Sequence, residues 1–137
     1  MARIGLDFAD LQDMLREMKD LGKDVDLAVE NALQKSKDYV TPNLEAEMNK
    51  HIETGKTKAA IESTSTVKND GVSAYIEVGF DISKEIAESG YPVSIFLMYG
   101  TPHMRPDKKL YNAIYGGKAK KEIQRIQEEE FYKVLNS

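Results

Sequence analysis

The feature that most constrains the fold is an alternating stretch near the middle of the chain. Apolar side chains occupy every second position from Val72 to Phe80, with Ser73, Tyr75 and Glu77 between them, which is typical of a strand with one face on a core. A threonine-rich run, Ile61 to Lys68, precedes it, and 69–71 (Asn-Asp-Gly) joins the two. Such residues tolerate the positive φ of a tight turn. The sequence therefore predicts a β-hairpin.

Helical spacing dominates the chain before this hairpin. Apolar residues recur at helical intervals between Asp7 and Leu21, and Gly22 is a plausible helix stop. A second helix is expected to begin near Lys23 or Asp24 and to end or kink around Val40, because Pro42 lacks a backbone donor. Residues 43–53 are expected to form a further helical piece.

The chain after the hairpin predicts one more strand and then helices. Residues 81–91 read as a connector with a short helical turn around Ile86, and the apolar run Val93 to Tyr99 reads as a third, buried strand. Asp107 is a suitable cap for a following helix. Gly116 and Gly117 interrupt that helix, which resumes over 118–135.

This order predicts a single α+β domain over residues 1–137. It comprises N-terminal helices, a small antiparallel β-sheet made of the hairpin plus a third strand, and C-terminal helices. The helix within residues 1–22 has one apolar stripe near a terminus, so it is also able to dock separately.

Composition excludes several classes of protein. The 137 residues suit one domain, and the absence of cysteine excludes a disulfide scaffold, a zinc ribbon and a thiol nucleophile. The longest apolar run is five residues, which is too short for a bilayer, so no membrane partner is expected. The first residues lack the apolar core of a signal peptide, which predicts a protein made and used in a cytoplasm.

Charge is distributed unevenly along the chain. The net charge is -4, yet residues 101–137 carry 8 basic and 5 acidic groups. The basic residues expected to contact DNA or an acidic partner subunit are Arg105, Lys108, Lys109, Lys118, Lys120, Lys121 and Arg125. A solvated helix face is the alternative interpretation of this segment, and the one we favour from the residues alone.

Two groups of residues resemble catalytic motifs. Gly55-Lys56-Thr57 resembles the end of a phosphate-binding loop, but Lys50 stands where that loop needs a glycine, so a helix stop is favoured. His103 lies near Arg105 and two lysines, a group able to bind phosphate and move a proton as in a small ribonuclease. A solvated polar turn is the favoured alternative. The histidine spacing predicts no zinc site, and no cofactor is expected.

Two segments together resemble a phage virion family, the head–tail joining proteins of long-tailed phages, also called neck or tail-completion proteins. One segment is Thr54-Gly55 followed six residues later by Ile61, and the other is the run Phe96 to Pro106. The structural motif residues that the resemblance carries over are Thr54, Gly55, Tyr99, Gly100, Thr101 and Arg105. It covers roughly residues 23–135. Departures are Met98 where glutamate is usual, Ala60 where serine is frequent, and an apparent insertion at 43–53.

The resemblance implies a structural role and no catalytic group. Such proteins assemble as rings between the DNA-filled head and the tail, so the expected partners are other copies of this chain, neighbouring head-closure and tail proteins, and DNA passing through the ring. The expected location is the virion, and the host cytoplasm during assembly. The alternatives from other classes are a small ribonuclease or phosphodiesterase that uses His103 and Arg105, and a DNA-binding accessory protein.

Overall fold

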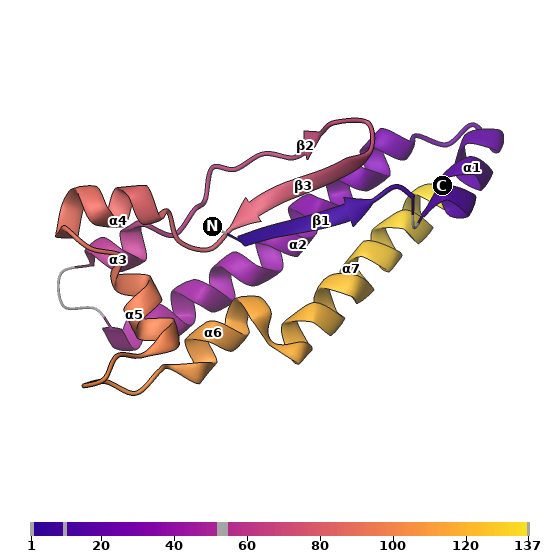
Figure 1. Cartoon of the computed structure of the whole chain (residues 1–137). Helices are drawn as coiled ribbons and strands as arrows, with labels where there is room; N and C mark the ends of the chain where they lie inside the picture. The colour runs from indigo at the N-terminus through magenta and orange to yellow at the C-terminus, as the bar shows by residue number, and fades with distance from the viewer. Residues whose placement is uncertain (1, 10, 52–54, 137) are drawn as a thin grey trace.

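The computed structural model describes residues 2–9, 11–51 and 55–136 and has a mixed α+β fold (Figure 1). The α+β class and the small antiparallel sheet are confirmed, but a strand and not a helix comes first. In chain order the elements are β1 (Ala2–Asp7), α1 (Gln12–Asp20), α2 (Val25–Met48), the 3-10 turn η1 (Asn49–His51), α3 (Lys56–Ala59), β2 (Lys68–Asn69), β3 (Ser73–Val78), α4 (Ile82–Ser89), α5 (Val93–Tyr99), α6 (Lys108–Tyr115) and α7 (Gly117–Leu135).

The sheet has three antiparallel strands in the order β1-β3-β2. The register of β1 against β3 runs from Ala2 opposite Val78 to Asp7 opposite Ser73. One face of the sheet lies over α2 (Figure 1) and carries the buried side chains of the sheet. These are Ile4 and Leu6 of β1 and Ala74, Ile76 and Val78 of β3.

The predicted hairpin exists, but its first strand is much shorter than expected. Only Lys68–Asn69 pair with β3, and Asn69 and Asp70 close the 69–71 turn with their side chains. Upstream, the Ser65 hydroxyl accepts the Glu77 N–H (3.0 Å) in place of a backbone partner. Serine and threonine hydroxyls compete in this way for backbone groups, which explains why most of 61–68 lies outside the ladder.

Helix α2 continues through Pro42, so the predicted end or kink at Val40 is wrong as a boundary. Asp24 caps the helix by accepting the Leu27 N–H at 3.0 Å. Beyond the proline, Leu44 and Met48 are fully buried, and this packing outweighs the lost backbone hydrogen bond. The separate piece expected at 43–53 is therefore the end of α2 followed by η1, and 52–53 lie outside the described residues.

We expect Pro42→Ala to raise the free energy of unfolding by about 1–2 kcal/mol. Pro42 is exposed, so alanine loses no packing, restores an N–H to the helix and removes a penalty of about 3 kcal/mol, less about 1 kcal/mol of unfolded-state entropy. Urea denaturation measures the difference, with Asn43→Ala as the neighbouring exposed control. A destabilised Pro42→Ala variant would contradict this prediction.

Residues 93–99 form the helix α5, so the third buried strand is wrong. Ser94 and Met98 are buried, four positions apart, whereas Phe96 and Tyr99 are exposed. An unbroken apolar run carries no period of its own, and here burial every fourth residue shows a helix. Its first turn is fixed by the Glu85 carboxylate of α4, which accepts both the backbone N–H (2.7 Å) and the hydroxyl (2.6 Å) of Ser94.

The C-terminal helices begin and break where the sequence predicts. Asp107 caps α6 by accepting the Leu110 N–H at 3.1 Å. A Cβ on Gly116 would lie 2.6 Å from the Asn112 carbonyl oxygen, which explains a glycine at the break. Helix α7 packs along α2. None of the helices in the described ranges combines the length and apolar character that a membrane crossing needs.

Candidate functional site

The segment that carries the family resemblance forms a tight turn at one end of the molecule. Helix α5 ends at Tyr99, and Gly100 turns the chain with φ +78° and ψ 176°. Thr101 and Met104 then exchange two backbone hydrogen bonds of 2.9 and 3.2 Å. Residues 102–106 are exposed, and the turn projects beyond α5 and α6 in Figure 1. Gly55 is described, with φ +77°, whereas Thr54 lies outside the described residues.

Two groups of aromatic side chains come from the segments before and after this turn, and together we call them the aromatic surface, defined as Tyr91, Phe96, Tyr99, Tyr111 and Tyr115. Tyr91 stacks on Phe96 with ring centroids 5.8 Å apart. Tyr111 contacts Tyr99 at 5.5 Å and Tyr115 at 5.0 Å. Burial, together with the two neighbouring tyrosines, raises the pKa of Tyr115. Tyr99 nevertheless remains 59% exposed, so this surface is open to a partner.

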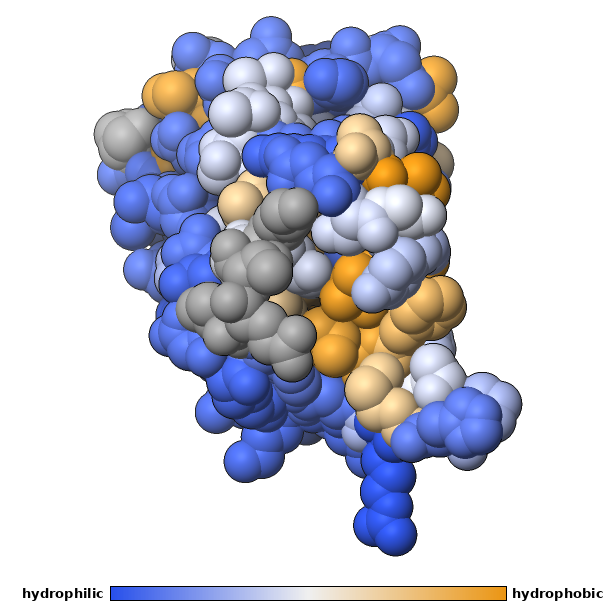
Figure 2. Space-filling view, turned by 90° about the vertical axis from the view of Figure 1, so that its left-hand side faces the viewer, coloured by the Kyte–Doolittle hydropathy of each residue, from blue (hydrophilic) through white to orange (hydrophobic). Residues whose placement is uncertain are grey.

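Figure 2 views the end of the molecule that carries α3, α4 and α5. Most of the apolar surface in this view gathers on one side of the face, and smaller apolar spots lie near its upper edge. Ile86, Tyr91 and Phe96 from this end are between 37% and 53% exposed. Exposed apolar surface of this kind, rimmed by polar residues, is typical of protein–protein contacts.

The predicted basic residues lie on the exposed turn and on the first turns of two helices. Arg105 is exposed, Lys108 and Lys109 begin α6, and Lys118, Lys120 and Lys121 lie near the start of α7. Arg125 differs because Glu122 (3.1 Å) and Glu129 (2.9 Å) pair with it. Among the described residues, none of the five lysines has an ion-pair partner.

These lysines stand where cations do not help their helices. A helix N-terminus carries partial positive charge, which disfavours a cation there, and the first turns of α6 and α7 contain no acidic residue. The lysines are therefore free to contact an acidic partner, whether protein or nucleic acid.

The two histidines occupy separate environments. His103 is exposed in the turn, and its backbone N–H donates to the Thr101 hydroxyl at 3.2 Å. His51 of η1 instead contacts Asp107, with 2.6 Å between Nε2 and Oδ2. The described residues bring no second acid or base to His103 and contain no cluster of three metal-ligating side chains. The His103 and Arg105 group is thus a pair of exposed turn residues.

The His51–Asp107 contact was not predicted, and it joins the end of α2 to the start of α6. Lys50 adds an ion pair to the same carboxylate at 3.1 Å. Burial of this carboxyl group works to raise its pKa, but hydrogen bonds from His51, the Leu110 N–H and Lys50 outweigh burial and lower the pKa of Asp107 to about 2. The site is a charged junction between helices.

We expect Asp107→Asn to lower the free energy of unfolding at pH 7 by about 1–2 kcal/mol, because asparagine keeps the cap but loses the charge. The folded pKa lies below the ordinary 3.8, so this contribution is present above about pH 4 and is lost as the pH falls through about 2. Urea denaturation of both proteins from pH 7 to pH 2 measures the gap. A gap that stays constant down to pH 2 would contradict the assignment.

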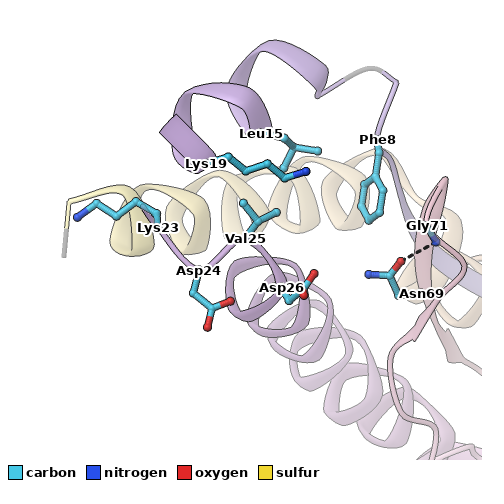
Figure 3. A pocket seen from close by; sticks show the side chains of 9 residues that line it. All are labelled: Phe8, Leu15, Lys19, Lys23, Asp24, Val25, Asp26, Asn69 and Gly71. Atoms are coloured by element: carbon cyan, nitrogen blue, oxygen red, sulfur yellow. Dashed lines mark hydrogen bonds between the residues drawn. The ribbon is translucent and has the colours of Figure 1, made fainter. Parts of the chain in front are cut away.

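A shallow cleft of about 490 Å³ lies between α1, the start of α2 and the 69–71 turn (Figure 3). Phe8, Leu15 and Val25 form its apolar walls, with Lys19 and Asp26 at its margin. Its lysines and aspartates are mixed in sign and do not converge on one point in Figure 3. The cleft exists because α1 packs loosely on the rest of the protein: Met18 is the only buried residue among 12–20.

Comparison with known proteins found no relative of this chain. No family model, no curated protein and no solved structure matches the chain. A proposal of function therefore has to be argued from the geometry of the turn, the aromatic surface and the lysines.

Proposed function

We propose that this protein is a structural virion component of a tailed phage or prophage, acting at the head–tail connector as a ring of identical copies. The observation that carries the proposal is the turn after Gly100. It lies within the segment that resembles the head–tail joining family, its backbone conformation requires glycine, and it presents an exposed tip.

The surfaces around the turn support assembly through a repeated contact. A ring repeats one heterologous interface, in which a patch on one copy meets a different patch on the next. The aromatic surface supplies apolar area, and the lysines of α6 and α7 lie on different elements from exposed acidic residues of the 61–100 segment such as Asp70 and Glu88. Opposite charge on the two patches fixes the register of such a contact. The ring bridges neighbouring head-closure and tail proteins and surrounds the DNA path.

The test compares assembly of two tyrosine variants. Tyr99 and Tyr132 are equally exposed, at 59% and 60%, but Tyr132 lies on α7, away from the aromatic surface. We expect the wild type to form rings in sedimentation velocity and negative-stain electron microscopy at high concentration or with neighbouring virion proteins. Tyr99→Ser should abolish them and Tyr132→Ser should not. A strict monomer under all these conditions would contradict the proposal.

Nuclease activity would also contradict it. We expect no cleavage of RNA or DNA that depends on His103, because that side chain is exposed and the described residues place no second acid or base beside it. Incubation of wild type and His103→Ala with both nucleic acids measures this. Robust cleavage by the wild type that the variant loses would favour the phosphodiesterase alternative.

A further inference from the structure

Strand β1 lies at the edge of the sheet, and one of its sides faces no other strand. The Phe8 N–H donates to the Val72 carbonyl at 3.2 Å, in continuation of the β1–β3 register. Hydrogen-bonded and non-hydrogen-bonded pairs alternate in an antiparallel ladder. The even-numbered residues of β1 therefore direct their backbone groups to β3, and Arg3 and Gly5 direct theirs outward. In the part of the chain that the structure describes, these outward groups meet no hydrogen-bond partner.

A groove of about 270 Å³ lies beside this open edge. Apolar side chains from three helices line it, namely Val40 of α2, Ile114 of α6 and Ile123 of α7. Gln124 and Gln127 of α7 contribute amide groups. Figure 1 shows α7 running past the outer side of β1. A fourth strand added to this edge would therefore lie next to α7.

The charge of the groove indicates the sign of its occupant. Its lining includes the cations Arg3 and Lys120 and no acidic residue. Arg3 lies 3.8 Å from Glu77 and over the Tyr75 ring, on the face of the sheet opposite the core. Lys120 has no ion-pair partner among the described residues. A carboxylate on the occupant would compensate this excess of positive charge.

We propose that the outer edge of β1 binds an extended segment of a partner protein as a fourth strand, and that this segment alternates apolar and acidic residues. Only an extended backbone matches a row of outward N–H and C=O groups spaced two residues apart. Its side chains alternate between the two faces of the sheet. Apolar ones meet Ile114 and Ile123, and acidic ones lie on the same face as Arg3. This goes beyond the ring contact, whose test centres on Tyr99, although Tyr115 and Lys120 of the ring surfaces also line this groove.

The probe is a capped hexapeptide of alternating valine and glutamate, added to the full-length chain labelled with nitrogen-15. We expect the amide signals of Arg3 and Gly5 to shift on binding and their hydrogen exchange to slow. A peptide N-methylated at alternate residues should bind roughly tenfold or more weakly, because it cannot donate to the edge. A peptide with lysine in place of glutamate should lose about as much affinity.

Gly5→Pro is the sharpest variant because it removes one outward N–H. Proline is tolerated on an edge strand where that group faces solvent, and Gly5 is exposed. We expect the variant to keep its unfolding midpoint and to lose binding roughly tenfold. Lys120→Glu, a surface change, should weaken the glutamate peptide and strengthen the lysine peptide. If Gly5→Pro fails to fold, two tests of strand addition remain: binding of the N-methylated peptide, and binding of the glutamate and lysine peptides to Lys120→Glu.

Three results would overturn the proposal. One is the absence of any shift at Arg3 and Gly5, or shifts confined to the aromatic surface. Another is binding that N-methylation does not weaken. The third is concentration-dependent protection of the Arg3 and Gly5 amides without peptide, which would make a second copy the occupant. Tyr99→Ser should still bind the peptide, so failure of ring assembly and failure of strand addition are distinguishable.

Discussion

Replacing Gly100 with alanine should lower the free energy of unfolding by about 4 kcal/mol, with about 1–3 kcal/mol from backbone strain and a similar amount from overpacking. Its φ of +78° and ψ of 176° fall in a region that glycine alone adopts readily. A Cβ there would lie 2.9 Å from the Met104 carbonyl oxygen and from both Cδ and N of Pro106. Backbone and a proline ring cannot move aside cheaply. Urea denaturation measures the loss, and ring assembly should disappear with it.

Gly90→Ala is the matched control for this change. Gly90 also follows a helix and has φ +83°, but its ψ of -10° is left-handed helical, and nothing lies within 4 Å of an added Cβ. Only the cost of left-handed backbone applies, about 1 kcal/mol. Equal losses in the two variants would show that contact with Pro106 and Met104 contributes nothing.

The second large effect is expected at Glu85. Its side chain is 2% exposed and accepts two hydrogen bonds from Ser94, through the backbone N–H and the hydroxyl. Glu85→Ala leaves two buried donors without partners, which should cost about 3 kcal/mol. The loss should be local at first, because these bonds join α4 to the first turn of α5. Hydrogen exchange at Ser94 and the global unfolding curve measure the two levels.

Glu85→Gln separates the loss of hydrogen bonds from the loss of charge. The glutamine carbonyl oxygen can still accept the Ser94 N–H, so we expect a loss of about 1 kcal/mol. If alanine and glutamine were equally destabilising, charge and not hydrogen bonding would hold the two helices together. If neither destabilised the protein, the α4–α5 junction would be stabilised by packing alone.

Local signals in the sequence correctly predicted helix starts, a helix break and one strand. Asp107 caps α6 as expected, the second helix begins next to Asp24 as expected, and Gly116 separates α6 from α7. The alternation of 72–80 was correctly assigned to a strand over 73–78. The caps and the glycine break act over a few residues, and the alternation of 72–80 by itself marks the buried face of the strand, so these features are visible in the sequence alone.

What was missed depends on contacts between distant parts of the chain. Ile4 and Leu6 alone mark β1, and its partner strand begins at Ser73. Helix α2 passes Pro42 because Leu44 and Met48 are buried against other elements. The apolar run 93–99 has no period that distinguishes a strand from a helix.

The candidate site likewise has features that local sequence predicted and features that depend on distant contacts. Local spacing found the turn at 100–106 and the lysines at the starts of α6 and α7, and their chemistry was left open between partner and solvent. The aromatic surface escaped prediction because Tyr91, Phe96 and Tyr99 were assigned to a connector and a buried strand. The His51–Asp107 pair escaped as well, since 56 positions separate the two residues.

The pairing of the first strand with the middle of the chain also sets an order of events during synthesis. Ala2 faces Val78 across the sheet, so β1 leaves the ribosome long before its partner exists. At roughly 5–20 residues per second, the delay is on the order of 4–15 seconds. Throughout that interval both sides of the nascent strand lack a neighbouring strand, and α2 is completely translated before it ends. The helix is thus available as the first template, and the sheet closes onto it last.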